Sequence, residues 1–159
     1  MQAAKPAQAA GTTFIVNSTG DDNDLDFPGG TLDRSSNDRC DVDSNTAGDQ
    51  CTLRAAIQEA NVTAGADTIA FDIPSSDTNC DTNTHVCTIA VGNKLPEITQ
   101  RVTIDGYTQG HATSDTADDA TVNTLTEPEK TNADLKIQLF RDGGPRTVCP
   151  SVVVPPMSL

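Results

Sequence analysis

The sequence has few of the large side chains that fill compact protein cores. It contains no tryptophan and one tyrosine, and aromatic residues make up 3% of its 159 residues. Because large rings supply much of the buried area in a compact core, this chain must build its core from isoleucine, valine, leucine and alanine. The composition disfavours a helical bundle and favours a stacked, quasi-repetitive β structure with some disorder.

Positive charge is also scarce. Lysine and arginine total 10 against 23 aspartates and glutamates, which gives a net charge of −13. An acidic surface repels phosphate backbones and anionic lipid headgroups, so we expect no nucleic acid among the partners. We also expect no membrane insertion, since no apolar run approaches the length of a spanning helix. The acidic balance is typical of a solvated surface, and cation binding is the alternative.

The residues of several common catalytic and metal sites are missing. There are two histidines, His85 and His111, both in polar stretches, and no C-x-x-C pair, which leaves little for a zinc site. No G-x-S-x-G motif is present. Aspartate is so frequent in this chain that two aspartates in the sequence do not by themselves indicate the carboxylate pair of a glycoside hydrolase. We therefore predict no catalytic residues and two exposed histidines.

Five cysteines are present, and four of them fall into two close pairs. The spacing predicts the disulfides Cys40–Cys51 and Cys80–Cys87 and leaves Cys149 unpaired. Disulfides indicate an oxidising compartment, so the protein is expected to be secreted or on the cell surface. The alternative is a cytosolic protein with free thiols.

One helix is predicted, from Thr52 to about Thr63. Its apolar residues recur at helical spacing and form a single narrow stripe, made up of Leu53, Ala56, Ile57, Ala60 and Ala64. Thr52 is the predicted N-cap and Gly65 the predicted C-terminal stop. Arg54 lies off the stripe and is expected to pair with a loop carboxylate.

Short β-rich runs make up most of the remaining order. They lie at residues 12–16, 68–73, 87–91, 101–106 and 135–139, with a further short piece beginning at Ile98. Long polar loops of unequal length separate them, which favours a solenoid over a sandwich. The predicted fold is therefore mainly β: the start of a parallel β-helix with one capping helix.

Three regions are predicted along the chain. Residues 1–11 form a disordered tail, in which Ala-Gln-Ala at 7–9 is either the end of a signal peptide or part of an alanine-rich tail. Residues 12–140 form the cap and first coils. Residues 141–159 form an irregular tail, interpreted as the product of a truncated or frameshifted gene.

A family resemblance supports this organisation. The run at 51–61, Cys-Thr-Leu-Arg-Ala-Ala-Ile-Gln-Glu-Ala-Asn, resembles the CSLREAI-type N-terminal domain, and segments 13–18, 65–71, 95–99 and 102–109 extend the similarity. The resemblance implies the start of a bacterial secreted or surface protein built on a right-handed, pectin-lyase-like parallel β-helix. It supplies no catalytic residues. One departure is Ala55, which stands where the family has glutamate and removes half of a capping box.

An acidic loop is the candidate metal site. Asp22, Asp24 and Asp26 place oxygen ligands at alternating positions, which is a pattern that can hold calcium, and no other cofactor is expected. The loop lacks the glycine and the distal glutamate of an EF-hand. A solvated acidic loop is the alternative.

Three functions are consistent with these observations. The first is a non-catalytic capping module of a surface β-helix, used in adhesion or display, whose partners are the remaining coils and an unidentified polysaccharide or protein. The second is the front of a polysaccharide lyase or glycoside hydrolase whose active coils are missing. The third is a calcium-dependent binding module. The tail at 141–159 has two prolines in its apolar run and no helix to act as a lid, so we also expect the last strand, at 135–139, to be uncovered and to promote self-association.

Overall fold

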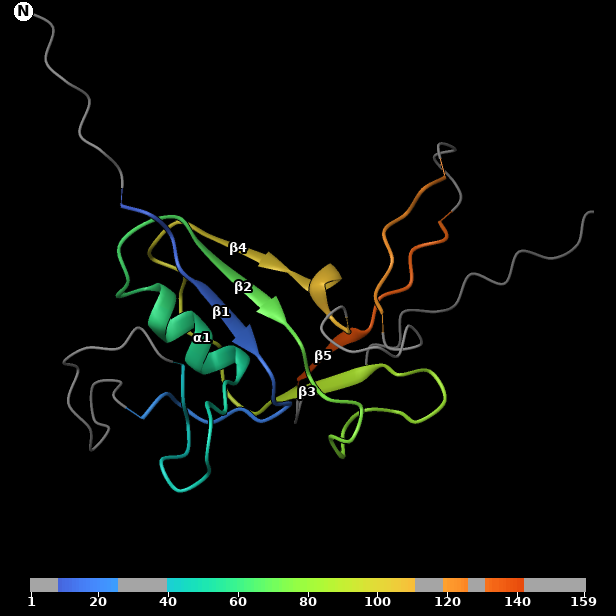
Figure 1. Cartoon of the computed structure of the whole chain (residues 1–159), viewed down its shortest axis with the longest axis horizontal. Helices are drawn as coiled ribbons and strands as arrows, with labels where there is room; N and C mark the ends of the chain where they lie inside the picture. The colour runs from blue at the N-terminus through green and yellow to red at the C-terminus, as the bar shows by residue number, and fades with distance from the viewer. Residues whose placement is uncertain (1–8, 26–39, 111–118, 126–130, 142–159) are drawn as a thin grey trace, which may run out of the picture.

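The computed structural model describes residues 9–25, 40–110, 119–125 and 131–141 (Figure 1). Residues 1–8 of the predicted tail at 1–11, residues 142–159 of the predicted tail at 141–159, Cys149 and His111 lie outside these residues. Within them the elements are, in chain order, β1 (Thr13–Val16), α1 (Leu53–Ala60), β2 (Asp67–Phe71), β3 (Cys87–Val91), β4 (Val102–Asp105), the 3-10 helix η1 (Gly106–Thr108) and β5 (Ile137–Arg141).

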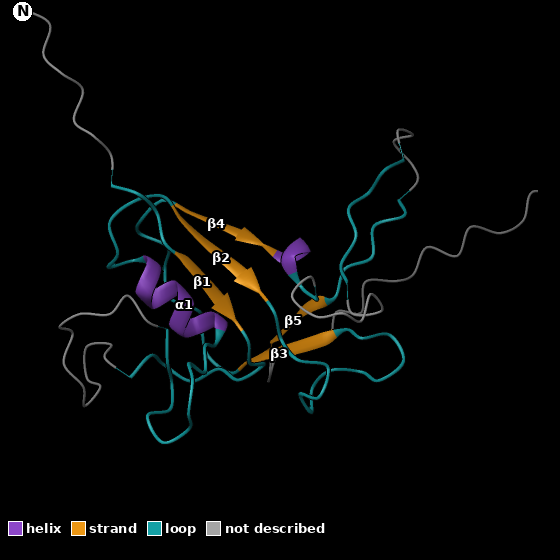
Figure 2. Ribbon diagram, in the orientation of Figure 1, coloured by secondary structure: helices purple, strands orange, loops and turns teal. Residues whose placement is uncertain are grey.

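The strands form two small parallel sheets. The first has the order β1-β2-β4 and the second pairs β3 with β5 (Figure 2). From β2 onward, successive strands alternate between the two sheets. The pair β2 and β3 therefore adds one strand to each sheet, and so does the pair β4 and β5. The predicted mainly β fold with one α-helix is confirmed for the residues described. Strand positions agree within two residues, except that Ile98 begins no strand.

The core follows from the alternation of side chains along the strands. In β1 the side chains of Phe14 and Val16 are buried, whereas those of Thr13 and Ile15 are exposed. The register aligns Phe14 with Ile69, and Ile69 with Ile104, so apolar side chains stack from strand to strand. This stacking builds a core from aliphatic side chains and two phenylalanines, Phe14 and Phe71, with no tryptophan.

The helix begins where the sequence predicts. Thr52 is the N-cap, and its Oγ1 accepts a hydrogen bond from Ala55 N at 3.1 Å while donating to Asp22 O at 2.8 Å. Ala55 is fully buried. The cap therefore joins the helix to the loop that precedes it by 30 residues.

The predicted helix end is wrong. The helix ends at Ala60, and Ala64 is not part of it. The chain leaves the helix at Asn61, whose side chain bonds to the backbone of a later segment. Its Nδ2 donates to Glu97 O at 2.8 Å, and its Oδ1 accepts from Thr99 N at 2.7 Å. Gly65 does not end the helix but lies at a backbone crossing: its φ is 137°, and an added Cβ would lie 2.6 Å from Ala10 O.

The predicted single apolar stripe is also incomplete. Every residue of α1 is buried, including the polar residues Arg54, Gln58 and Glu59. The loop at 17–25 covers the polar side. Gln58 accepts from Asp24 N at 2.9 Å and donates to Asn23 Oδ1 at 2.8 Å. The helix is thus enclosed between the sheet and a polar loop.

Candidate functional site: the open end of the two sheets

The two ends of the fold are finished differently. At the β1 end, α1 packs against β1 and β2 (Figure 2). Leu53 and Ile57 of the helix join the same buried cluster as Phe14, Val16 and Ile69. The helix thus covers apolar side chains that the first strand would otherwise expose.

Arg54 fixes this cover in place. Its Nε and Nη2 contact the carboxylate of Asp21 at 3.0 and 2.9 Å, while Nη1 donates to Lys94 O at 3.1 Å and Nη2 to Asn93 O at 3.0 Å. The predicted pairing of Arg54 with a loop carboxylate is confirmed. One buried guanidinium thereby links the helix, the loop at 17–25 and the turn that follows β3.

At the opposite end, none of the described residues forms such a cover. In the residues described, β4 and β5 each pair on one side only. Apolar side chains on and beside these strands are exposed, namely Ile98, Ile104, Tyr107, Leu135 and Leu139. The predicted open apolar end is therefore observed in this part of the chain.

A cavity of about 450 Å³ opens between the two sheets at this end. It is lined almost entirely by apolar side chains, which come from α1, β2, β4, β5 and their flanking segments: Leu53, Ile57, Phe71, Leu95, Pro96, Ile98, Ile104, Asp105, Gly106, Tyr107, Leu135, Ile137 and Leu139. Because residues of both β4 and β5 line one cavity, the last strand of each sheet borders the same apolar opening.

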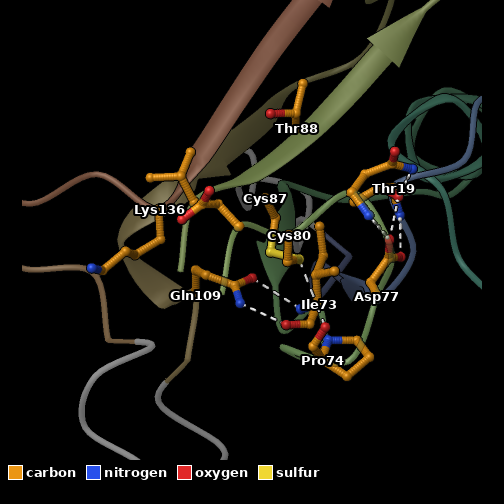
Figure 3. The surroundings of a disulfide bond; sticks show 12 residues. Thr19, Ile73, Pro74, Asp77, Cys80, Cys87, Thr88, Gln109 and Lys136 are labelled. Carbon is orange, nitrogen blue, oxygen red and sulfur yellow. Dashed lines mark hydrogen bonds between the residues drawn. A yellow bond between two sulfur atoms is a disulfide. The ribbon is translucent and has the colours of Figure 1, made fainter. Parts of the chain in front are cut away.

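Both predicted disulfides are confirmed. Cys40 is bonded to Cys51 and Cys80 to Cys87, and all four residues are buried. The first bond closes the loop that leads into the helix cap at Thr52. The second closes the loop between β2 and β3 (Figure 3).

Asp77 links this second loop to the loop that follows β1. The hydroxyl and backbone N–H of Thr19 donate to its two carboxylate oxygens at 2.7 and 3.2 Å, and Asn79 N donates at 3.0 Å (Figure 3). Burial by itself would raise the pKa of Asp77. The hydrogen bonds from Asn79 and Thr19 outweigh burial and hold the pKa below its ordinary value of 3.8.

The candidate calcium loop is described only in part. Asp24 is buried and accepts a hydrogen bond from Asp41 N at 2.9 Å, Asp22 is exposed, and Asp26 lies outside the described residues. Across the residues that are described, no group of three or more histidine, cysteine, aspartate or glutamate side chains is arranged to hold a metal ion. Calcium binding stays a prediction.

Sequence reasoning missed the amide side chains that replace strand pairing. Asn17 Oδ1 accepts from Cys51 N at 2.8 Å, Asn61 bridges to residues 97 and 99, and Gln109 bonds to both backbone groups of Ile73. In sequence they look like loop residues, and no local signal marks them. The prediction that His85 is exposed is also wrong, since it is half-buried, with a φ of 57°.

Comparisons with known proteins identify no relative. No protein-family model, no curated protein and no solved structure matches the chain. Among the residues described, there is no helix with the length and apolar character needed to cross a membrane.

Proposed function

We propose that this chain is the non-catalytic N-terminal cap of an extracellular right-handed parallel β-helix. The observation that carries the proposal is the difference between its ends. A helix and a buried arginine cover the β1 end, whereas at the β4 and β5 end the described residues leave apolar side chains exposed beside an apolar cavity. A stacked fold needs a cover where it begins and a continuing surface where the next unit joins.

The alternation of strands between two parallel sheets supports the same proposal. A further coil would add one strand beside β4 and one beside β5, and its apolar side chains would fill the cavity between them. The partner of the open end is therefore a parallel β coil. The resemblance at 51–61 to the CSLREAI-type domain points to the same architecture.

The two disulfides are compatible with an extracellular location. In such a protein the cap would provide a stable beginning for the solenoid, and adhesion or display would depend on the coils that follow. The second function considered, a lyase or hydrolase, would place its active groove on those later coils.

The test is the solution state of the isolated chain. An uncovered apolar end should cause concentration-dependent self-association, measured by light scattering. Added salt should increase it, because each copy carries a charge of −13 and screening weakens the mutual repulsion. Replacing Leu135 and Leu139 together by lysine should leave the chain monomeric.

Val62→Lys is the matched control, since Val62 is 59% exposed, close to the 56% of Leu135 and 55% of Leu139, but lies outside the open end. This variant should self-associate like the unmodified chain. A monodisperse, thermally stable monomer in the unmodified chain would contradict the proposal.

A further inference from the structure

The three strands of the first sheet carry the same two-residue repeat at the same level. Thr13 lies beside Thr68 in the register, and Thr68 lies beside Thr103 (Figure 2). The residue that follows each threonine is large and apolar: Phe14, Ile69 and Ile104. The repeat joins segments that are distant in the sequence, so it is a property of the stacked strands.

The two positions of the repeat differ in burial. The apolar residues Phe14 and Ile69 are buried in the core, whereas Thr13 and Thr103 are exposed and Thr68 is half-buried. A slip of one residue in any strand would turn its apolar residue to the solvent and its threonine to the core. The repeat therefore specifies the register in which a strand stacks on this sheet.

Strand β4 carries the third copy of the repeat and, among the described residues, pairs only with β2. Asp67 N donates to Arg101 O at 3.0 Å. Because alternate residues of a parallel ladder bond to the same neighbour, the backbone N–H and C=O groups of Val102 and Ile104 point away from β2. The side chain of Ile104 is 46% exposed and lines the apolar cavity, whereas Ile69 beside it is 0% exposed.

We propose that the open end binds a parallel strand that carries this repeat, with its threonine beside Thr103 and a large aliphatic residue beside Ile104. Main-chain hydrogen bonds to Val102 and Ile104 hold the strand, and its aliphatic residue enters the cavity that Leu139 lines from the other sheet. This inference rests on the proposed capping function and adds to it the residue pattern and the register of the coil that follows.

Disulfide trapping measures the register. Neighbouring strands lie about 4.8 Å apart, so cysteines directly opposite each other can bond, whereas a cysteine two residues along the strand is about 8 Å away and cannot. The probe is a peptide with the sequence of residues 66–73, Ala-Asp-Thr-Ile-Ala-Phe-Asp-Ile. One version carries Thr68→Cys and the other Ala70→Cys. Each is mixed in excess with the dilute full chain carrying Thr103→Cys and Cys149→Ser, in a thiol–disulfide buffer.

The peptide with Thr68→Cys should form about ten times more mixed disulfide with the chain than the peptide with Ala70→Cys, because only the first places its sulfur opposite position 103. Mass spectrometry measures the yields. Adding Ile69→Asp to the first peptide should abolish the trapping, since a carboxylate would enter the apolar cavity. The matched control is Val62→Cys in place of Thr103→Cys, at a position that is exposed but outside the open end. It should trap both peptides equally.

Equal trapping of the two peptides at Thr103→Cys, or yields no higher than with Val62→Cys, overturns the inference. So does coupling of the chain mainly to a second copy of itself while the peptide is in excess, because a second copy would then be the occupant. Light scattering of the unmodified chain tests the capping function separately. Self-association without a preferred register leaves the capping function standing and removes only this inference.

Discussion

The side chain of Gln109 completes the sheet beside the backbone of Ile73. Its Nε2 donates to Ile73 O at 2.7 Å and its Oε1 accepts from Ile73 N at 2.9 Å, and Gln109 is 1% exposed. Strand β4 ends at Asp105, so among the described residues no strand lies beside these two backbone groups of Ile73 on that side. The amide supplies a donor and an acceptor in the place of a peptide group.

Gln109→Ala should therefore destabilise the fold by about 2–4 kcal/mol, because it leaves a buried N–H and a buried C=O unsatisfied. Gln109→Glu keeps the acceptor but sets a second oxygen against Ile73 O and buries a carboxyl group, so it should also destabilise the fold. Gln138→Ala, on the exposed side of β5, should change stability by less than about 0.5 kcal/mol. Urea unfolding measures all three, and equal stabilities for the two alanine variants would argue against this role.

Acid should weaken the fold through Asp77. Its pKa is lower in the folded chain than its ordinary value of 3.8, so its contribution is fully present above about pH 4 and is lost as the pH falls through the lowered pKa. Asp77→Asn should remove this part of the pH dependence of unfolding free energy. Asp22→Asn, at an exposed side chain, should preserve it. The prediction fails if the two variants lose stability with acid in parallel.

The disulfides should be necessary for stability. Replacing both Cys40 and Cys51 by alanine, or both Cys80 and Cys87, should cost about 2.5–3 kcal/mol for loops of these lengths. Since four of the five cysteines are paired, alkylation without reductant should add one label, at Cys149, and alkylation after reduction five. Mass spectrometry decides the count, and Cys149→Ser should not affect melting.

Calcium binding at the acidic loop has a direct test. If Asp22, Asp24 and Asp26 form a site, millimolar Ca²⁺ should raise the melting temperature, and Asp24→Ala should abolish the rise. Asp24→Ala also removes the bond from Asp41 N, so the informative quantity is the change with calcium and not the melting temperature itself. Asp72→Ala should retain the full response. No shift in the unmodified chain would identify the loop as a solvated one.

The sequence predicted what depends on neighbours along the chain. Alternating apolar residues located the strands, the position of Thr52 located the helix start, and cysteine spacing gave both disulfides. The helix end and the burial of its polar side were not predictable, because they depend on Asn61, Gln58 and Arg54 bonding to segments 33 to 40 residues away. The open end could be predicted, because the run at 135–139 is the last one in the sequence that alternates like a strand.

Arg54 gives the strongest test of how the β1 end is covered. Its guanidinium meets the Asp21 carboxylate and two backbone carbonyls in one buried site, and Asp21 also accepts from Gly92 N at 3.0 Å. Arg54→Met should cost about 3–5 kcal/mol, because it leaves Asp21 without its counter-charge. Arg54→Lys should still cost about 2 kcal/mol, since a single ammonium cannot reach the forked set of acceptors.

The exposed Arg101 provides the control, because only its backbone carbonyl is used in the sheet. Arg101→Lys should change stability by less than about 0.5 kcal/mol. Combining Arg54→Met with Asp21→Asn should cost less than the sum of the two single changes, since each removes the same ion pair. If the double variant instead costs the sum of the two single changes, Arg54 acts through packing alone. The Arg54–Asp21 ion pair would then not hold the helix over the end of the sheet.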